Sequence, residues 1–425
     1  MFTKVFASAA LAAISQAQVD LEFTPHGTFK INNAAFIEIN RFEDSEDFML
    51  VSTFGPVATG YIYIVPGLKE AVVAGDISNL QSYKLDTPDF TWPNNLAAVP
   101  QDVFGERAIV VPDGFVVPMH GNGGIYVVRM DETDLTKTKE TVKITAHKSH
   151  YFYHMGEWID LNGDGRKDFL TARSNGKKGE GELLWLEHPE DGLESGEPWT
   201  EHLIGNLADV GFLVDTMDEY PDEIIIYVAH FFDEAIRMLR VSTKDGSLVQ
   251  AKTIDDTEIL SAYSVTVTDL NGDGKRQLMV NNHQKKDKET GIWAYEFPED
   301  PMNDDWSRVA LATNFHNAFS LTAPNMSPGF PYVFYPNGKK EGERAHILVA
   351  GDGDHAAHAM YPTGEDFGYD NTIFKQTDGT VGCMAFSDLD DDGWKEVWLP
   401  VYNDSSISLY KISTPASSAP EEFLQ

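Results

Sequence analysis

One pattern recurs along the sequence at fairly even intervals, and this repeat limits the possible folds more than any other feature. A short apolar segment is followed by a polar or Gly-rich stretch and then by a second segment rich in Leu, Ile and Tyr. Seven copies occupy residues 47–67, 114–132, 168–192, 223–246, 277–300, 346–366 and 396–413. Successive copies start 67, 54, 55, 54, 69 and 50 residues apart. This spacing fits a four-stranded sheet with its loops and is too long for a leucine-rich or ankyrin unit.

Segments that flank the copies supply the other two strands of each sheet. Inner strands precede the copies at 154–160, 263–269 and 382–388, and outer strands follow them at 198–205 and 305–313. The last copy has no outer strand after it, but segment 23–37 resembles 199–213, so Phe23 to Lys30 is predicted to complete the last sheet. We therefore predict an all-β, seven-bladed β-propeller with four-stranded blades, closed by its N-terminal strand. The alternative is a sandwich array or two separate β domains. The lack of a Pro/Gly/Ser-rich linker in 20–413 argues against this alternative.

Both ends of the chain have compositions unlike the repeats. Lys4 precedes an apolar stretch from Val5 to Ile14 and the small residues that end at Ala17, which is typical of a signal peptide. A buried first strand or helix is the alternative. We predict a signal peptide at 1–17, a propeller at 18–414 and a disordered tail at 415–425, and hence a secreted, extracellular protein. Sequons at Asn325 and Asn403 are compatible with a glycoprotein.

The charge and the cysteine content argue against anionic partners and against stabilisation by disulfide bonds. The formal net charge is −35, so nucleic acid and anionic membrane surfaces are expected to be repelled. No apolar run approaches the roughly 18 residues of a membrane span. Cys383 is the one cysteine, so no internal disulfide can form. We expect a monomer whose partners are calcium and a small sugar or glycan.

Three loops share one pattern of oxygen-bearing side chains. They are 160–168, 269–277 and 388–396. Each loop has Asp at positions 1 and 5, Asn or Asp at position 3, and Gly at position 6. Side chains at positions 1, 3, 5 and 9 and the carbonyl of position 7 supply the oxygens that Ca²⁺ requires. The predicted ligands are Asp160, Asn162, Asp164, Arg166 (carbonyl) and Asp168; Asp269, Asn271, Asp273 and Lys275 (carbonyl); and Asp388, Asp390, Asp392, Trp394 (carbonyl) and Glu396.

Several features separate these loops from other acidic turns. An EF-hand needs Glu at position 12, where this sequence has Thr171, Val280 and Leu399, and its flanking segments are helices rather than strands. Gln277 replaces the last carboxylate of the second loop, which lowers its ligand charge. The alternative is a plain Asp/Asn/Gly turn with no metal. Three matched copies favour structural calcium, which is expected to stabilise the fold by mass action.

With these loops the chain resembles the FG-GAP/VCBS propeller family, which includes integrin α-chains and many secreted microbial proteins. The resemblance implies a propeller in which calcium loops join the inner strand to the next strand. It extends over nearly the whole chain as a repeat, but it is specific only at the three loops, because the other four copies lack the full pattern.

Histidines recur at equivalent positions of the repeat. Four copies have one at or beside the sixth residue after the start, and the inner strands add another imidazole together with Tyr263 and Asp209. In a propeller these positions line one rim of the central channel, where imidazoles are suited to proton transfer or to a transition metal. Each histidine alone is more often structural. The candidate catalytic residues are His154, His230, Tyr263, His120, His283 and His355.

Two phrases, GELLWLEHPEDG and EPWTEHLIG, and the position of His154 before Asp160 are similar to the propeller of fungal aldos-2-ulose dehydratases. That resemblance implies a carbon-oxygen lyase or dehydratase that acts on a sugar, with His154 and His230 as base and acid and Tyr263 assisting. The alternative is a non-catalytic lectin or cell-adhesion module. Its candidate stacking residues are Trp92, Trp199 and Trp306.

Overall fold

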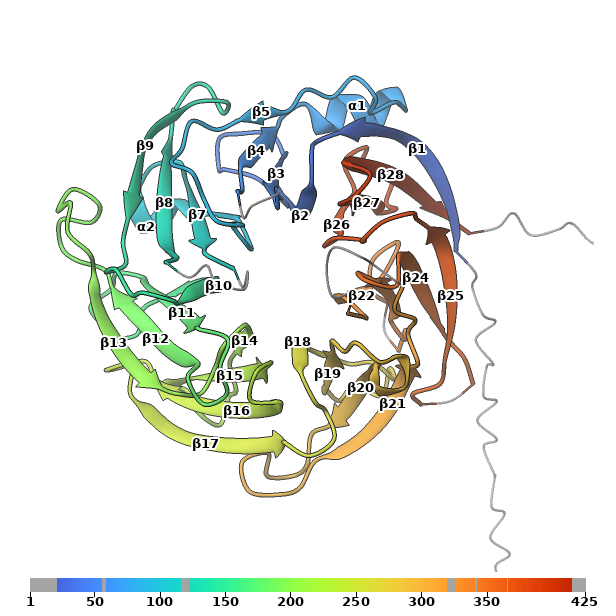
Figure 1. Cartoon of the computed structure of the whole chain (residues 1–425). Helices are drawn as coiled ribbons and strands as arrows, with labels where there is room; N and C mark the ends of the chain where they lie inside the picture. Colours follow the sequence, from blue (N-terminus) through green and yellow to red (C-terminus); the bar gives the residue numbers. More distant parts are fainter. Residues whose placement is uncertain are drawn as a thin grey trace, which may run out of the picture.

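Seven antiparallel sheets are arranged around one axis (Figure 1). This computed structural model describes residues 21–55, 59–115, 122–318, 326–340, 342–364 and 366–414. Each sheet has four strands, so the predicted all-β, seven-bladed architecture is confirmed. The predicted signal peptide and C-terminal tail lie outside the described residues, as does His120.

The strands of each blade run from the axis outwards in chain order, except in the last blade. Blade 1 has β2 (Ala34–Asn40), β3 (Phe48–Thr53), β4 (Ile62–Val65) and β5 (Tyr83–Lys84). Blade 2 has β6 (Ala97–Ala98), β7 (Ala108–Asp113), β8 (Gly124–Met130) and β9 (Thr138–Lys143). Blade 3 has β10 (Phe152–Ile159), β11 (Asp168–Ser174), β12 (Glu182–Glu187) and β13 (Thr200–Gly205). Blade 4 has β14 (Gly211–Asp215), β15 (Glu223–His230), β16 (Ala235–Ser242) and β17 (Leu248–Asp255). Blade 5 has β18 (Ala262–Thr268), β19 (Gln277–Asn282), β20 (Gly291–Glu296) and β21 (Ser307–Thr313). Blade 6 has β22 (Pro331–Phe334), β23 (His346–Ala350), β24 (Ala356–Pro362) and β25 (Tyr369–Gln376). Blade 7 has β26 (Ala385–Ser387), β27 (Glu396–Val401), β28 (Ser406–Ser413) and β1 (Glu22–Lys30).

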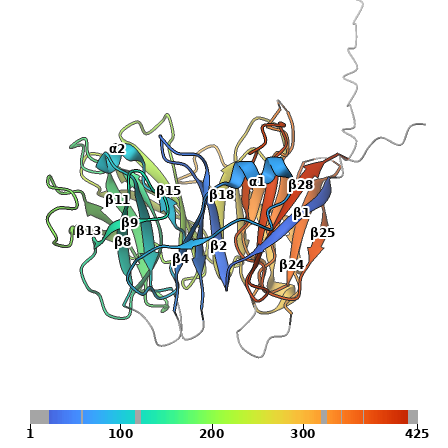
Figure 2. The same ribbon diagram turned by 90° about the horizontal axis from the view of Figure 1, so that it is seen from above.

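The two ends of the described chain meet in blade 7. Strand β1 pairs antiparallel with β28, and Phe29 lies opposite Ile407. Figures 1 and 2 show β1 along the outside of β28. Phe29 is buried in one apolar cluster with Ile407 and Leu409. The predicted closure by the N-terminal strand is therefore confirmed, and it covers the edge of β28 that would otherwise be open to pairing.

The core lies between neighbouring blades, and its position explains the apolar repeat. Every residue of β3, β7, β11, β19, β23 and β27 is buried. These second strands are covered on both faces by the adjacent sheets, so they are nearly continuous apolar runs rather than alternating ones. The outer strands β13 and β25 are mostly exposed or half-buried.

The predicted boundaries of the second copy are wrong. The prediction began this copy at residue 114, but its buried second strand is β7, which ends at Asp113. The segment 108–118 contains two apolar runs separated by Asp113 and Gly114, and hydrophobicity alone does not decide which run pairs. The backbone decides it. Gly114 has φ +94°, and a Cβ there would lie 2.5 Å from Cα of Gly123, so the chain turns at this glycine.

Two short helices interrupt the repeat, and neither was predicted. Helix α1 (Leu68–Ala74) lies between β4 and β5, and α2 (Gln101–Phe104) lies between β6 and β7. A short 3₁₀ turn, η2 (Asp287–Glu289), precedes β20. Across the described part of the chain, no helix has the length and apolar character needed to cross a membrane.

Candidate functional site

The three acidic loops join the innermost strand of a blade to its second strand, so they share one end of the molecule. In blade 3, the Asp160 carboxylate accepts backbone N–H groups from Gly163 (2.7 Å) and Gly165 (2.9 Å). In blade 5, Asp269 accepts the equivalent groups from Gly272 (2.7 Å) and Gly274 (3.0 Å). The two turns therefore have the same conformation.

Glycine at position 6 is required by the backbone of these turns. The φ angles of Gly165, Gly274 and Gly393 are +88°, +85° and +84°, a region that other residues adopt only with strain. Position 5 fixes the next residue in all three loops. Its carboxylate accepts the backbone N–H of Arg166, Lys275 or Trp394, each at 2.8 Å.

The ninth residue holds each loop to the following strand. Asp168 Oδ2 accepts the N–H of Leu161 at 2.9 Å, and Glu396 Oε2 accepts that of Leu389 at 3.1 Å. Gln277 Oε1 accepts the N–H of Leu270 at 2.7 Å. The glutamine therefore performs the structural part of the carboxylate's role without its charge.

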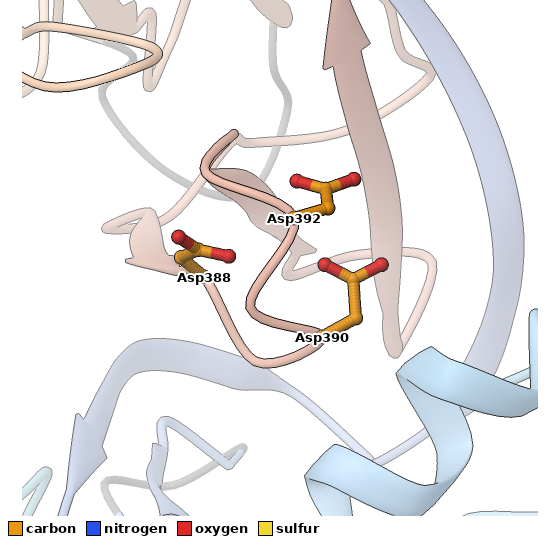
Figure 3. A group of neighbouring side chains, drawn as sticks. All are labelled: Asp388, Asp390 and Asp392. Atoms are coloured by element: carbon orange, nitrogen blue, oxygen red, sulfur yellow. The ribbon is translucent and has the colours of Figure 1, made fainter.

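The third loop gathers three carboxylates between β26 and β27 (Figure 3). Ligand oxygens of Asp388, Asp390 and Asp392 all lie within 4.8 Å of one another. Lys411 contacts Asp390, and Lys69 pairs with the neighbouring Asp391 at 2.6 Å. Hard oxygen donors at this density match the ligands that Ca²⁺ takes. The chemistry of the donor set therefore fits the predicted ion.

The predicted histidines gather at the opposite end of the blades, which we call the channel mouth. In an antiparallel pair, the start of the innermost strand lies beside the end of the second strand. His154 and Tyr263 are near the starts of β10 and β18. His230 ends β15, and His283 and His355 follow β19 and β23. These five residues therefore lie at the same end of the blades, but His154 and His230 are buried there and do not line the channel.

Two of the predicted residues are in direct contact with each other. Tyr263 and His283 stack with ring centroids 4.5 Å apart and an interplanar angle of 16°. His283 Nδ1 lies 2.9 Å from the Pro328 carbonyl oxygen, so this nitrogen carries the hydrogen and Nε2 is left with a lone pair. Nε2 lies 3.8 Å from Oδ2 of Asp352. A histidine, a carboxyl group and a phenol thus meet at the mouth.

Burial moves the pKa values of these three groups toward their neutral forms. Desolvation lowers the pKa of His283 to about 4. Desolvation, reinforced by Asp354, raises the pKa of Asp352 to about 7, although its side chain is 30% exposed in the channel. Desolvation also raises the pKa of Tyr263 far above its usual range. The carboxyl of Asp352 therefore titrates near neutral pH.

His154 is enclosed by aromatic rings. Its residue is 1% exposed, and neither ring nitrogen has a hydrogen-bond partner among the described residues. Phe115 and Phe36 lie edge-on to it, with centroid distances of 5.4 and 6.1 Å. Desolvation alone lowers its pKa to about 4. These surroundings therefore favour the neutral imidazole.

His230 lies within a buried network of charged groups. Its Nε2 is 3.5 Å from Asp209, its Nδ1 is 3.5 Å from Asp233, and Arg237 contacts the same Nδ1. The residue is 0% exposed. Asp209 in turn accepts the backbone N–H groups of Phe231 and Phe232, so this cluster fixes the loop after β15.

The backbone of His355 forms part of the turn after β23. It has φ +60°, and its N–H donates to the Asp352 carbonyl at 3.1 Å. Its own carbonyl accepts the side chains of Gln376 and Thr377. His355 therefore shapes the turn that presents Asp352. The transition metal suggested for the funnel stays a prediction.

A closed circuit of aromatic rings surrounds the mouth, and the sequence patterns did not predict it. Neighbouring centroids lie between 4.7 and 6.4 Å apart. The circuit joins blades 1 to 6; His154 contacts two of its members, Phe36 and Phe115, and His283 stacks on a third, Tyr263. In order, its members are Phe36, Phe54, Phe115, Phe152, Phe232, Phe231, Tyr263 and Phe330.

A cavity of about 180 Å³ adjoins this circuit. Phe36, Phe330 and Tyr332 line it together with Glu38 and Cys383. Glu38 lies on the innermost strand β2 and is exposed to the channel. Desolvation and Glu157 raise the pKa of Glu38 to about 7, and only Asn40 opposes them. The sequence analysis did not predict Glu38 as a site residue. The one feature that could have indicated it is its position between apolar residues of an innermost strand.

The three tryptophans considered for sugar stacking have partners within the protein. Trp92 stacks on Phe54 at 5.2 Å and donates its Nε1–H to the Gly55 carbonyl. Trp199 is 4% exposed and stacks on His188. Trp306 is half-buried against Phe297.

Comparison with known proteins finds similar solved structures but no family. One similar structure is a chain in an S. cerevisiae complex of a Dbp5 variant bound to Nup159, a Gle1 variant, IP6 and ADP. It has a TM-score of 0.53 and 9% identity, over 94% of this chain and 96% of that chain. The Dos1 propeller has a TM-score of 0.47 and 9% identity, over 92% of this chain and 95% of that one. No protein-family model and no curated protein matches the sequence. The protein is a seven-bladed β-propeller, and its assignment to the FG-GAP/VCBS family stays a prediction.

Proposed function

We propose that this protein is a secreted, calcium-stabilised propeller that eliminates water from a small sugar at the channel mouth. The observation that carries the proposal is the meeting of His283, Tyr263 and Asp352. The His283 Nε2 lone pair lies 3.8 Å from the Asp352 carboxyl, and Tyr263 stacks on the same imidazole. The three groups come from blades 5 and 6.

Elimination next to a carbonyl needs one proton acceptor and one proton donor. A pKa of about 7 suits Asp352 as the base, because a base works best when its pKa is near the working pH. The Asp352 carboxylate takes the proton next to the sugar carbonyl, the released electron pair forms a C=C bond, and the C–OH bond breaks. Tyr263 keeps its proton at neutral pH and gives it to the departing hydroxyl, which leaves as water. His283 stacks on Tyr263 and lies beside Asp352.

In this proposal His154 and His230 position the site rather than react. His230 is held by Asp209, Asp233 and Arg237, and neither ring nitrogen of His154 has a hydrogen-bond partner in the described part of the chain. Calcium at the three acidic loops would fix the other end of the innermost strands, and so would act on stability and not on the chemical step. Asp160, Asp269 and Asp388 would each contribute the first ligand of a loop.

The test is a screen of the purified protein against keto-sugars, anhydrofructose first, and against uronate polymers. An unsaturated product that absorbs in the ultraviolet is expected. Loss of general acid–base catalysis is expected to lower kcat by at least about 100-fold in Asp352→Asn and Tyr263→Phe. His147→Gln changes an exposed histidine outside the mouth and serves as the matched control. Unchanged melting temperatures would show that the loss is catalytic.

Two results would refute the lyase proposal. One is full activity in Asp352→Asn. The other is the absence of an unsaturated product from every sugar while the folded protein still binds sugars. The second result would instead support a lectin, which the partly exposed rings of the aromatic circuit favour because aromatic faces pack on sugars.

A further inference from the structure

We infer that the central cavity is a binding site for a small organic cation of the quaternary ammonium class. The inference goes beyond the proposed lyase activity and does not depend on it. It rests on the combination of three aromatic rings and one carboxylate around one cavity.

The rings are arranged as the walls of a cage. Phe36 and Phe330 lie at 72° to each other with centroids 6.3 Å apart. Tyr332 continues the wall at 6.5 Å from Phe330, at an angle of 41°. All three residues are half-buried, so part of each ring is open to the channel. A cation that enters this space is attracted by the negative faces of several rings at once.

The residues that line the cavity carry negative charge and no positive charge. Glu38 is the one ionisable carboxylate among the residues that line the cavity, and no basic side chain lines it. Glu38 forms no ion pair within the described residues, while Glu157 repels it. The undescribed internal segments 56–58, 116–121, 319–325, 341 and 365 contain no Lys or Arg. A ligand cation would therefore supply the missing counter-charge.

Size and hydrogen bonding argue against a larger or neutral polar ligand. The volume of about 180 Å³ is below the roughly 300–1,000 Å³ typical of drug-sized sites. A neutral sugar needs several converging polar groups, and beside Glu38 the lining offers only the side chains of Asn95, Tyr332 and Cys383. A methylated ammonium group needs few such partners, because its surface is apolar and its charge is diffuse.

Titration calorimetry of the full chain with choline and with 3,3-dimethyl-1-butanol tests the inference. The two probes have the same shape and differ in charge. In calcium and 0.15 M NaCl, which screens the general field of the acidic protein, choline is expected to bind at least about tenfold tighter than the alcohol. Glu38→Gln is expected to remove most of this difference. Glu190→Gln, the same change at an exposed loop residue outside the lining, is expected to leave it intact.

Equal affinity for both probes, or no binding of choline, would overturn the inference. An equal loss in Glu190→Gln and Glu38→Gln would also overturn it, because the attraction would then come from net charge alone. If Glu38→Gln does not fold, Cys383 provides a second readout on the unaltered protein, since its thiol lines the same cavity. Choline is then expected to slow alkylation of Cys383 by iodoacetamide, and the alcohol to slow it less. Equal protection by both probes would count against the cation.

Discussion

Replacing His154 with leucine is expected to remove a pH-dependent loss of stability. Burial lowers the pKa of His154 from 6.5 to about 4. The unfolded chain therefore binds a proton at this side chain between pH 6.5 and 4 while the folded chain does not. The contribution of His154 to stability is complete above pH 6.5 and is lost as the pH falls toward 4.

The size of this effect follows from the shift. Each pKa unit corresponds to about 1.4 kcal/mol, so the full loss is about 3 kcal/mol and the loss at pH 5 is about 2 kcal/mol. Leucine has a similar volume and does not titrate. It also removes two buried nitrogens that have no hydrogen-bond partner among the described residues, each of which costs about 1–3 kcal/mol.

The assay is guanidinium unfolding of the unaltered protein and of His154→Leu at pH 7.5 and pH 5.0. The change in unfolding free energy between the two pH values is expected to be about 2 kcal/mol smaller in the variant. Other buried groups, such as His283 and Asp352, titrate equally in both proteins and cancel. His147→Leu, at an exposed position, is expected to behave as the unaltered protein. Parallel pH dependence in His154→Leu would refute the reasoning.

Three further outcomes are expected from the fold and the acidic loops. Calcium at about 100 times its Kd is expected to stabilise the protein by about 2.7 kcal/mol for each loop that binds it; thermal melts with calcium and with chelator check this, and a gain unchanged in Asp392→Ala would count against the third loop. Phe29→Ala is expected to cost about 3–5 kcal/mol in denaturant unfolding, because the ring is buried where β1 meets β28, whereas the exposed Glu22→Ala is expected to cost little. Gly165→Ala is expected to lower stability by at least about 1 kcal/mol, because φ is +88° there; an unchanged melting temperature would contradict the required turn.

The blade pattern could be predicted from the sequence because the second strands are buried on both faces. This arrangement leaves apolar runs such as those of β23 and β27, and the loop motif marks where three of the second strands begin. In blade 2 no acidic loop precedes β7, so two neighbouring apolar runs were indistinguishable there. Helix α1 lies in an insertion whose length the repeat does not constrain.

The candidate site was predictable only as a set of equivalent positions. The repeat places His154, His230 and His283 at one end of the blades, but it does not specify the neighbours of each. The Pro328 carbonyl that fixes the His283 tautomer belongs to the next blade along the chain. The cavity brings residue 38 close to residues 330 and 383, and such contacts between blades leave no periodic signal in the sequence.

Hydrogen exchange of the intact chain tests most directly whether the N-terminal strand closes the ring. Closure of the ring is the arrangement that brings residues 36 and 383 to the same cavity. The peptide covering Glu22–Lys30 is the one to follow by mass spectrometry. About half of its amides, those that point toward β28 in the antiparallel pair, are expected to exchange as slowly as those of Ser406–Ser413. Complete exchange of that peptide at the rate of an unstructured chain, while the blades stay protected, would contradict the closure.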